Sequence, residues 1–351
     1  METIRLGKTE MMVTRLGFGG VPIQRLTEEE AVEIVRRSLD LGVNFIDTAN
    51  SYTNSEERIG KAIKERRDGL ILATKSFSRS PEEMEANLQL SLKRLGVDYI
   101  DLYQFHGVSD QNSLEIVLAS NGPRAVLEKA KKAGVIRHIG ITSHSVDIAK
   151  DAVKSGIFET IMIPFNCIVR EAVDELLPLA QKHDVGFIAM KPLAGGRLNN
   201  ATIAFKYLFQ FPDVVPIPGI ERMGEMEELV HILEGPHEMA TAEEKEMQKL
   251  RDELGTVFCR RCDYCQPCSV GIPISGAITI SNPEKRMPPE RLFHGWINDV
   301  LTKAAECIEC GDCEERCPYH LPIREMIKRE VEWYREEKRK YEEGLTTGQK
   351  R

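Results

Sequence analysis

The chain has 351 residues, of which 42% are hydrophobic and 29% charged, and its formal net charge is −8. This composition supplies a large core and excludes wholesale disorder, and the acidic balance argues against a nucleic-acid partner. No apolar run approaches the roughly 18 residues of a membrane-spanning helix, and the first ten residues, METIRLGKTE, lack the apolar stretch of a secretory signal. We therefore expect a cytoplasmic protein with neither nucleic-acid nor membrane partners.

The first two thirds of the sequence alternate short apolar runs with amphipathic segments, which predicts strands followed by helices. The eight expected strands are Leu16–Gly19, Asn44–Asp47, Leu70–Lys75, Tyr99–His106, Ile136–Thr142, Thr160–Pro164, Val185–Ala189 and Val214–Pro218. Eight such units predict a closed (β/α)8 TIM barrel over residues 1–235. An open doubly wound sheet is the alternative, but the run Gly17-Phe18-Gly19-Gly20 lacks the G-x-G-x-x-G fingerprint of that fold.

Start and stop signals delimit the predicted helices. Thr27 and Glu30 predict a capping box, and Ser80 with Glu83 predicts a second one, with Pro81 at the first helical position. The expected helix ends are marked by Gly42, Gly96, Gly134 and Gly156. After residue 235 the composition becomes charged, which predicts a helical connector over residues 236–258.

Four polar residues lie at or just after the C-terminal ends of the predicted strands, where barrel enzymes carry their chemistry. They are Asp47, Tyr52, Lys75 and His106. A tyrosine, with an ordinary pKa of about 10, needs a nearby ammonium to act as an acid or base at neutral pH. A carboxylate would keep the lysine charged, and a neutral histidine could donate a hydrogen bond to a substrate carbonyl oxygen. Each residue alone has an ordinary structural explanation, but together they predict proton-transfer chemistry.

The segments NFIDTANSY, LATK and LYQFH, which contain these four residues, resemble the aldo-keto reductases. The resemblance covers about residues 1–235 and implies a barrel that reduces an aldehyde or ketone with NAD(P)H. It also implies that Tyr52 donates the proton and that Lys75 lowers the pKa of Tyr52. Asp47 would pair with Lys75, and His106 would orient the substrate.

The same resemblance implies nicotinamide contacts in the later loops. The implied residues are Thr142, Ser143, Lys191, Leu193, Gly195, Gly196, Pro218, Gly219, Arg222 and Glu228. The sequence departs from the family pattern at Met162, Met190 and Leu229. Glu225 stands where the family often has an arginine for the 2′-phosphate of NADPH. We therefore predict that NADH is used at least as well as NADPH.

Eight of the nine cysteines form two groups of four near the C-terminal end of the sequence. The predicted metal ligands are Cys259, Cys262, Cys265, Cys268, Cys307, Cys310, Cys313 and Cys317. The second group has the spacing C-x2-C-x2-C-x3-C-P of bacterial ferredoxins, which predicts a 4Fe–4S cluster. Zinc is the alternative, but a structural zinc site takes only four ligands. The ninth cysteine, Cys167, is expected to be a buried apolar residue.

The cysteine-rich region, residues 259–325, resembles the two-cluster ferredoxin-like domains attached to some aldo-keto reductases, and a charged helix or tail follows over 326–351. Each cysteine triplet can wrap its own cluster, whereas Pro318 directs Cys317 away from its triplet. We therefore predict crossed ligation. Cys317 would complete the site of Cys259, Cys262 and Cys265, and Cys268 would complete the other site.

These predictions combine into an iron–sulfur aldo-keto reductase acting on a small-molecule carbonyl substrate, with ferredoxin or another redox protein as a further partner. The alternative is an iron–sulfur electron-transfer protein in which the barrel is a scaffold and the four residues are not catalytic. Nicotinamide transfers two electrons as a hydride and a cluster transfers one, so direct coupling would need a mediator such as a flavin.

Overall fold

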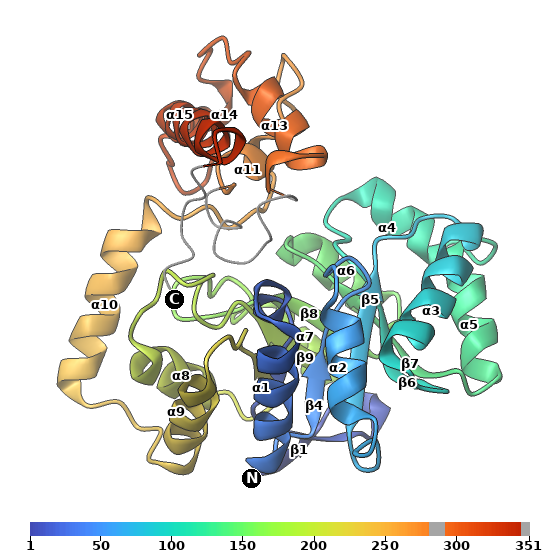
Figure 1. The fold of residues 1–351 in the computed structure, drawn as a ribbon. Coiled ribbons are helices and arrows are strands. Elements are labelled where there is room, and N and C mark those ends of the chain that lie inside the picture. The colour runs from blue at the N-terminus through green and yellow to red at the C-terminus, as the bar shows by residue number, and fades with distance from the viewer. Residues whose placement is uncertain (281–291, 345–351) are drawn as a thin grey trace. The chain divides into compact units, whose positions relative to one another are not determined.

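The computed structural model describes residues 1–280 and 292–344. The chain folds into two compact units, Met1–Gln248 and Lys249–Arg351, drawn from blue to red along the chain in Figure 1. The division falls inside helix α10 (Thr241–Gly255), in the segment that the sequence predicts as a connector.

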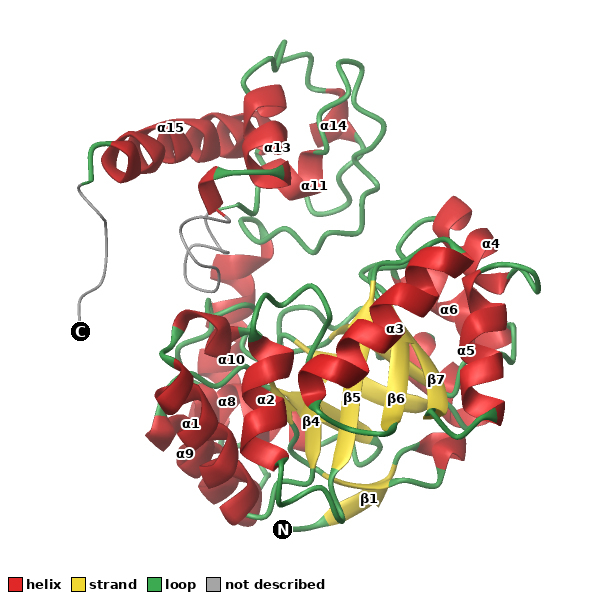
Figure 2. Cartoon of the chain, turned by 45° about the vertical axis from the view of Figure 1, so that its right-hand side comes forward, coloured by secondary structure: helices red, strands yellow, loops and turns green. Residues whose placement is uncertain are grey.

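Eight parallel strands form the first unit's sheet (Figure 2). In sheet order they are β3 (Phe18–Gly19), β4 (Phe45–Asp47), β5 (Ile71–Ser76), β6 (Ile100–Phe105), β7 (Ile136–Thr142), β8 (Thr160–Pro164), β9 (Gly186–Met190) and β10 (Val214–Ile217). A parallel bridge between Gly19 and Gly219 joins the last strand to the first and closes the barrel. A Cβ atom at Gly19 would lie 2.8 Å from the carbonyl oxygen of Pro218, so closure there requires glycine. The predicted (β/α)8 barrel is confirmed.

Nine helices accompany the strands within the described part of this unit. They are α1 (Glu28–Asp40), α2 (Ser55–Ile63), α3 (Pro81–Leu95), α4 (Gln111–Leu118), α5 (Pro123–Lys132), α6 (Val146–Lys154), α7 (Leu176–Lys182), α8 (Ala201–Phe209) and α9 (Met223–Glu234). The capping box of Thr27 and Glu30 is confirmed at the start of α1. The second predicted box is wrong: Ser80 caps α3, but the Glu83 carboxylate accepts from the backbone of Arg79, one residue too early.

An antiparallel hairpin that the sequence analysis did not predict precedes the barrel. It consists of β1 (Thr3–Arg5) and β2 (Met12–Thr14). Leu6 and Val13 are buried and pack with the inward-facing side chains of the barrel strands. The backbone of Lys8 donates to the carbonyl oxygen of Asp184, just before β9, so the hairpin lies at the N-terminal end of the strands. The opposite end is left for chemistry, as in other barrels.

The second unit has its own hydrophobic core, which includes Ile297, Leu301, Ile327 and Tyr334. Its described helices are α11 (Ile274–Ala277), α13 (Trp296–Ala304), α14 (Asp312–Glu315) and α15 (Ile323–Glu342). The predicted C-terminal helix is therefore present and starts three residues earlier than expected. Residues 281–291, in the stretch between the cysteine groups, and residues 345–351, in the predicted tail, lie outside the described residues.

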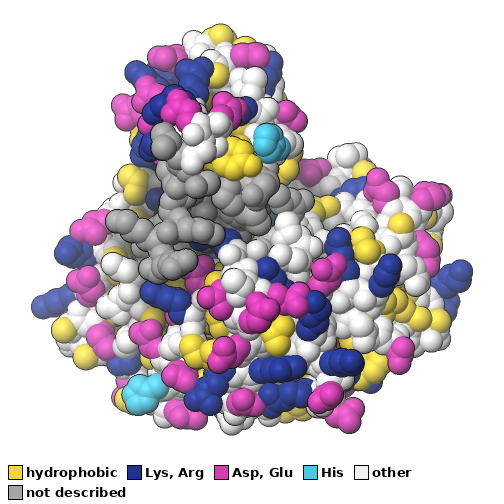
Figure 3. All heavy atoms as spheres, viewed as in Figure 1, with side chains coloured by type: hydrophobic (Ala, Val, Ile, Leu, Met, Phe, Trp, Pro, Cys, Tyr) yellow, Lys and Arg dark blue, Asp and Glu magenta, His cyan; other side chains and the backbone are white. Residues whose placement is uncertain are grey.

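Acidic and basic side chains are interspersed over the barrel helices on the face shown in Figure 3. Exposed ion pairs join Arg37 to Glu227 at 2.8 Å and Lys61 to Glu28 at 2.5 Å. Such pairs contribute little stability, because water screens them. A helix both long and apolar enough to cross a bilayer does not occur among the residues described.

Candidate functional site

Lys75 and Asp47 form a buried ion pair at the C-terminal ends of β5 and β4. Lys75 Nζ donates to Asp47 Oδ2 and, at 2.7 Å, to the carbonyl oxygen of Thr48. Burial alone would lower the pKa of Lys75, but the charges and hydrogen bonds of Asp47 and Tyr52 outweigh burial and raise it. Lys75 is therefore a permanent ammonium in this site.

Tyr52 and His106 complete the group. Lys75 Nζ lies 5.2 Å from the centroid of the Tyr52 ring, and the Tyr52 and His106 rings meet edge to face with centroids 5.9 Å apart. Burial lowers the pKa of His106 well below its ordinary value, and the charges of Lys75 and Arg79 lower it further. His106 is consequently a neutral hydrogen-bond donor at physiological pH. The structure brings all four predicted residues together at one end of the barrel.

Three further residues, which the sequence analysis missed, hold this group in position. Gln104 Nε2 donates to Asp47 Oδ1 at 3.0 Å. Phe77, although 54% exposed, stacks on the His106 ring with centroids 3.8 Å apart. Arg79 donates to the carbonyl oxygen of His106 at 2.8 Å and so ties the loops after β5 and β6 together. Only Gln104 carries a sequence signal: it stands two residues before His106, which places both on the same face of an extended chain.

Gln104→Leu is expected to lower kcat about tenfold or more and to destabilise the fold by about 1–3 kcal/mol, because a buried carboxylate oxygen of Asp47 loses its donor. Kinetics and thermal unfolding measure the two effects. The matched control is Gln181→Leu, since Gln181 makes the same amide–carboxylate bond, to Asp213 at 2.8 Å, on an exposed part of the surface. Equal behaviour of the two variants would contradict the role given to Gln104.

The predicted nicotinamide residues after β7 and β9 lie in two tightly bonded loops. Thr142 Oγ1 accepts from the backbone of Gly107 at 2.9 Å, and the Ser143 hydroxyl donates to the carbonyl oxygen of Ser145 at 3.1 Å. Lys191 Nζ lies 2.9 Å from His144 Nε2. The turn that follows Lys191 contains the rest of this set, Leu193, Gly195 and Gly196.

The predicted residues after β10 lie beside the start of α9. Pro218 and Gly219 belong to the barrel closure, since the Gly19 backbone donates to the Pro218 carbonyl oxygen at 2.7 Å. The Arg222 side chain is 80% exposed and pairs with Glu225 at 2.8 Å. Glu228 is exposed and adds to the negative charge around Arg222.

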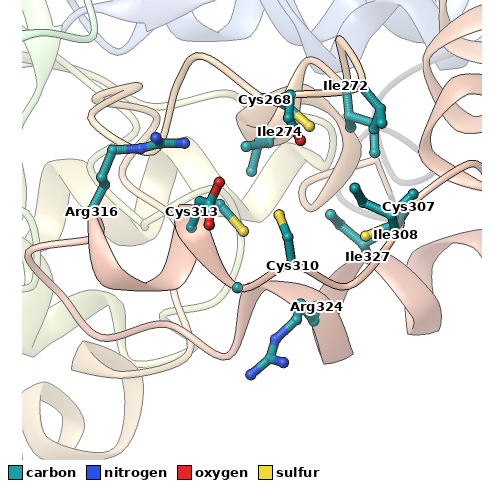
Figure 4. Close-up of a pocket in the computed structure, with 14 residues that line it drawn as sticks. Cys268, Ile272, Ile274, Cys307, Ile308, Cys310, Cys313, Arg316, Arg324 and Ile327 are labelled. Carbon is teal, nitrogen blue, oxygen red and sulfur yellow. The ribbon is translucent and has the colours of Figure 1, made fainter.

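Four of the predicted metal ligands line one cavity in the second unit: Cys268, Cys307, Cys310 and Cys313. Figure 4 shows the sulfur atoms of Cys310 and Cys313 directed toward each other, with Cys268 facing them from another segment. Four isoleucines supply apolar walls: Ile272, Ile274, Ile308 and Ile327. The cavity thus combines four thiols with apolar walls, and the charged side chains of Asp312, Arg316 and Arg324 also line it.

The other four cysteines influence one another electrostatically, which places them close together. Burial raises the pKa of Cys265 to about 12, with Asp263, Cys259 and Cys262 adding to the shift. Burial also raises the pKa of Cys262, and Cys317 contributes.

No disulfide links any of the eight cysteines of the second unit, all of which lie in the described residues. Across residues 1–280 and 292–344, no three His, Cys, Asp or Glu side chains converge closely enough to bind a single metal ion. Cys167, in the barrel unit, is fully buried, as its apolar character suggests.

Comparison with known proteins identifies the barrel. The model of the aldo/keto reductase family matches residues 15–203. L-galactose dehydrogenase of Arabidopsis thaliana is 34% identical over 217 residues, which cover 56% of this chain and 67% of that protein. The uncharacterized oxidoreductase YqkF of Bacillus subtilis is 32% identical over 212 residues, covering the same shares. The holo form of aldo-keto reductase AKR11C1 from Bacillus halodurans matches with a TM-score of 0.62 at 27% identity, covering 71% of this chain and 96% of that one. The chain therefore belongs to the aldo/keto reductase family of oxidoreductases.

Proposed function

We propose that the barrel reduces an aldehyde or ketone with NAD(P)H and that Tyr52 protonates the carbonyl oxygen. The observation that carries this proposal is the buried Lys75–Asp47 pair beside the Tyr52 ring. An ammonium held next to a phenol stabilises the phenolate, so Tyr52 can release its proton near neutral pH. When bound, the nicotinamide supplies the hydride that reduces the carbonyl carbon.

Each residue of the group has a separate part in this chemistry. Asp47 keeps Lys75 charged, and Gln104 fixes the Asp47 carboxylate. His106, kept neutral by burial, donates a hydrogen bond to the carbonyl oxygen as negative charge develops there. Mixing the protein with simple aldehydes and ketones and following NAD(P)H absorbance tests the proposal. Consumption that depends on the carbonyl compound supports it, and no consumption with any of them contradicts it.

The loops after β9 and β10 fit a dinucleotide. Lys191, Ala194, Gly195 and Gly196 have φ angles of +55°, +47°, +77° and +87°. This left-handed backbone folds the segment into a tight turn, in which the N–H groups of Ala194 and Gly196 donate to the carbonyl oxygens of Lys191 and Leu193. Lys191 adds a cation beside the turn. Barrel enzymes frequently bind phosphate at the loops after the seventh and eighth strands, which are β9 and β10 here. Lys191 and the turn after it would hold the pyrophosphate.

NADH is expected to bind at least as tightly as NADPH. Arg222 is the cation nearest the start of α9, but Glu225 neutralises it. Glu225→Gln is expected to strengthen the binding of NADPH relative to that of NADH by about two- to fivefold, which is the usual size of an electrostatic effect between exposed charges. Glu227→Gln is the matched control, because Glu227 lies on the same helix and pairs with Arg37 instead. Dissociation constants from fluorescence titration decide this, and a wild-type preference for NADPH would contradict the assignment.

The second unit is proposed to carry two 4Fe–4S clusters with crossed ligation. Support comes from the cavity that Cys268 shares with Cys307, Cys310 and Cys313, and from the electrostatic coupling of Cys317 to Cys262. The C-x2-C-x2-C-x3-C-P spacing of the second group favours a 4Fe–4S cluster over zinc, because it is the ligand spacing of bacterial ferredoxins, whereas a structural zinc site takes only four ligands.

A cluster exchanges electrons singly, so the partner proposed for this unit is a one-electron carrier, ferredoxin or another redox protein. Cluster ligands must be reduced thiols, so we propose a cytoplasmic location, where thiols stay reduced.

A further inference from the structure

The two cysteine triplets have left-handed backbone at the same two positions. The residue two positions after the first cysteine is left-handed in both: Arg261 has a φ of +61° and Glu309 has a φ of +54°. The residue directly after the second cysteine is also left-handed in both: Asp263 has a φ of +61° and Gly311 has a φ of +88°. Left-handed backbone is uncommon outside glycine. Its recurrence at matching positions indicates that the two triplets wrap their ligands in the same way.

The equivalent positions carry opposite charges, because Arg261 in the first triplet corresponds to Glu309 in the second. Between Cys259 and Cys268 the loop holds two arginines and one aspartate. Between Cys307 and Cys317 it holds four carboxylates and one arginine. The loops of the two triplets thus carry net charges of opposite sign.

Arg261 is fixed close to its own thiols. Its backbone N–H donates to Cys259 Sγ at 3.4 Å, and its guanidinium donates to Thr279 Oγ1, with Nε at 3.1 Å. The side chain is partly buried, whereas Glu309 is exposed. Water therefore screens Glu309 more than Arg261.

A cluster gains one negative charge on reduction, so a nearby cation favours the reduced state and raises the reduction potential. Resting on the iron–sulfur assignment above, we propose that Arg261 makes the site of Cys259, Cys262, Cys265 and Cys317 the stronger electron acceptor of the two. When the protein holds a single electron, that electron passes from the site of the Cys307 triplet, which is oxidised, to the site of the Cys259 triplet, which is reduced. Several features act against this order. The carboxylate of Asp263 lies near the same thiols, and Cys310 of the other site is exposed to water. Arg316 and Arg324 line the cavity of that other site, but both are exposed, and Arg324 is paired with Glu314 at 2.8 Å. The effect of Arg261 on the reduction potential is the larger one, because its guanidinium is fixed by Thr279 and partly shielded from water.

An anaerobic redox titration of the full chain, with dithionite as reductant and electron paramagnetic resonance as readout, tests this. Wild-type protein is expected to show two one-electron waves. Arg261→Gln should lower the midpoint potential of the upper wave by at least about 59 mV, which corresponds to a tenfold change in the oxidised-to-reduced ratio. The midpoint potential of the lower wave should not change. Arg261→Lys, which keeps the charge, should restore the upper wave. Arg329→Gln removes an exposed arginine of α15 and should move neither wave.

Each other outcome also decides the question. Coincident waves in the wild type, a shift of the lower wave alone, or no shift in Arg261→Gln would each overturn the assignment. If Arg261→Gln binds only one cluster, a surviving lower wave supports the proposal and a surviving upper wave contradicts it. Iron counting on the wild type separates a failure of the iron–sulfur assignment from a failure of the Arg261 proposal. If the protein contains no iron after anaerobic reconstitution with iron and sulfide, the iron–sulfur assignment itself is refuted.

Discussion

Replacing Tyr52 with phenylalanine is expected to reduce carbonyl reduction about 10²- to 10⁴-fold, the usual contribution of a positioned general acid. The variant removes only the phenolic oxygen, so the ring still packs edge to face with His106. Dinucleotide binding and the iron content should stay unchanged, because neither depends on that oxygen. Steady-state kinetics, dissociation constants and iron counting measure the three effects.

Tyr103→Phe is the matched control for this prediction. Tyr103 lies on β6 and is fully buried, and burial raises its pKa above the ordinary value, which makes it a poorer proton donor. This control should retain most of the activity. If Tyr52→Phe also retained its turnover, the proton donor would have to be another group, and the scaffold interpretation of the barrel would gain support.

Replacing Cys317 with serine is expected to remove about half of the iron, four of eight atoms, because one 4Fe–4S site loses a thiolate. Crossed ligation predicts that the damaged site is that of the Cys259 triplet, although Cys317 is adjacent in sequence to the Cys307 triplet. Under crossed ligation Cys317 would link two distant segments through the cluster, so melting of the second unit should also shift to lower temperature. Iron counting and calorimetry measure these effects.

Spectroscopic assignment decides which site is lost in the Cys317 variant. The Arg261→Gln shift labels the first site, so the double variant Cys317→Ser with Arg261→Gln should show no Arg261-dependent wave. Persistence of that wave, with loss of the other, would mean local ligation. Cys167→Ser controls for the general effect of removing a buried thiol, and it should keep all of the iron.

The sequence predicted the barrel strands well because each inward apolar run ends at a polar loop. Strands β7 and β8 match their predicted bounds, and the others differ by one or two residues at one end or at both ends. The hairpin of β1 and β2 was missed because its strands have only three residues each, too few for a periodic pattern. Its residues Leu6 and Val13 are buried only because they pack against the end of the barrel, so the sequence alone did not identify them as core residues.

The proximity of Asp47, Tyr52, Lys75 and His106 was predictable because strand ends converge in a barrel, whereas the residues that support them were not predicted. Phe77 and Arg79 act through a ring stack and a bond to the His106 carbonyl oxygen, and both depend on loop conformation. The capping role of Glu83 failed for a similar reason, since a long carboxylate reaches either of two adjacent N–H groups. The sequence spacing of the cysteines indicated their ligand chemistry, but the charge contrast of Arg261 and Glu309 needed the matched backbone to be recognised.

Transfer of deuterium from reduced nicotinamide labelled at C4 to the product is the most direct test of the central claim. The reaction is run anaerobically with the clusters in place, and the product is examined by mass spectrometry and NMR. Hydride transfer in the barrel predicts that one deuterium, from one face of the nicotinamide, appears on the former carbonyl carbon of the product. The Tyr52→Phe variant should form almost none of this labelled product. Oxidation of the nicotinamide without deuterium in the product would contradict the account, because electrons would then reach the substrate singly through the second unit.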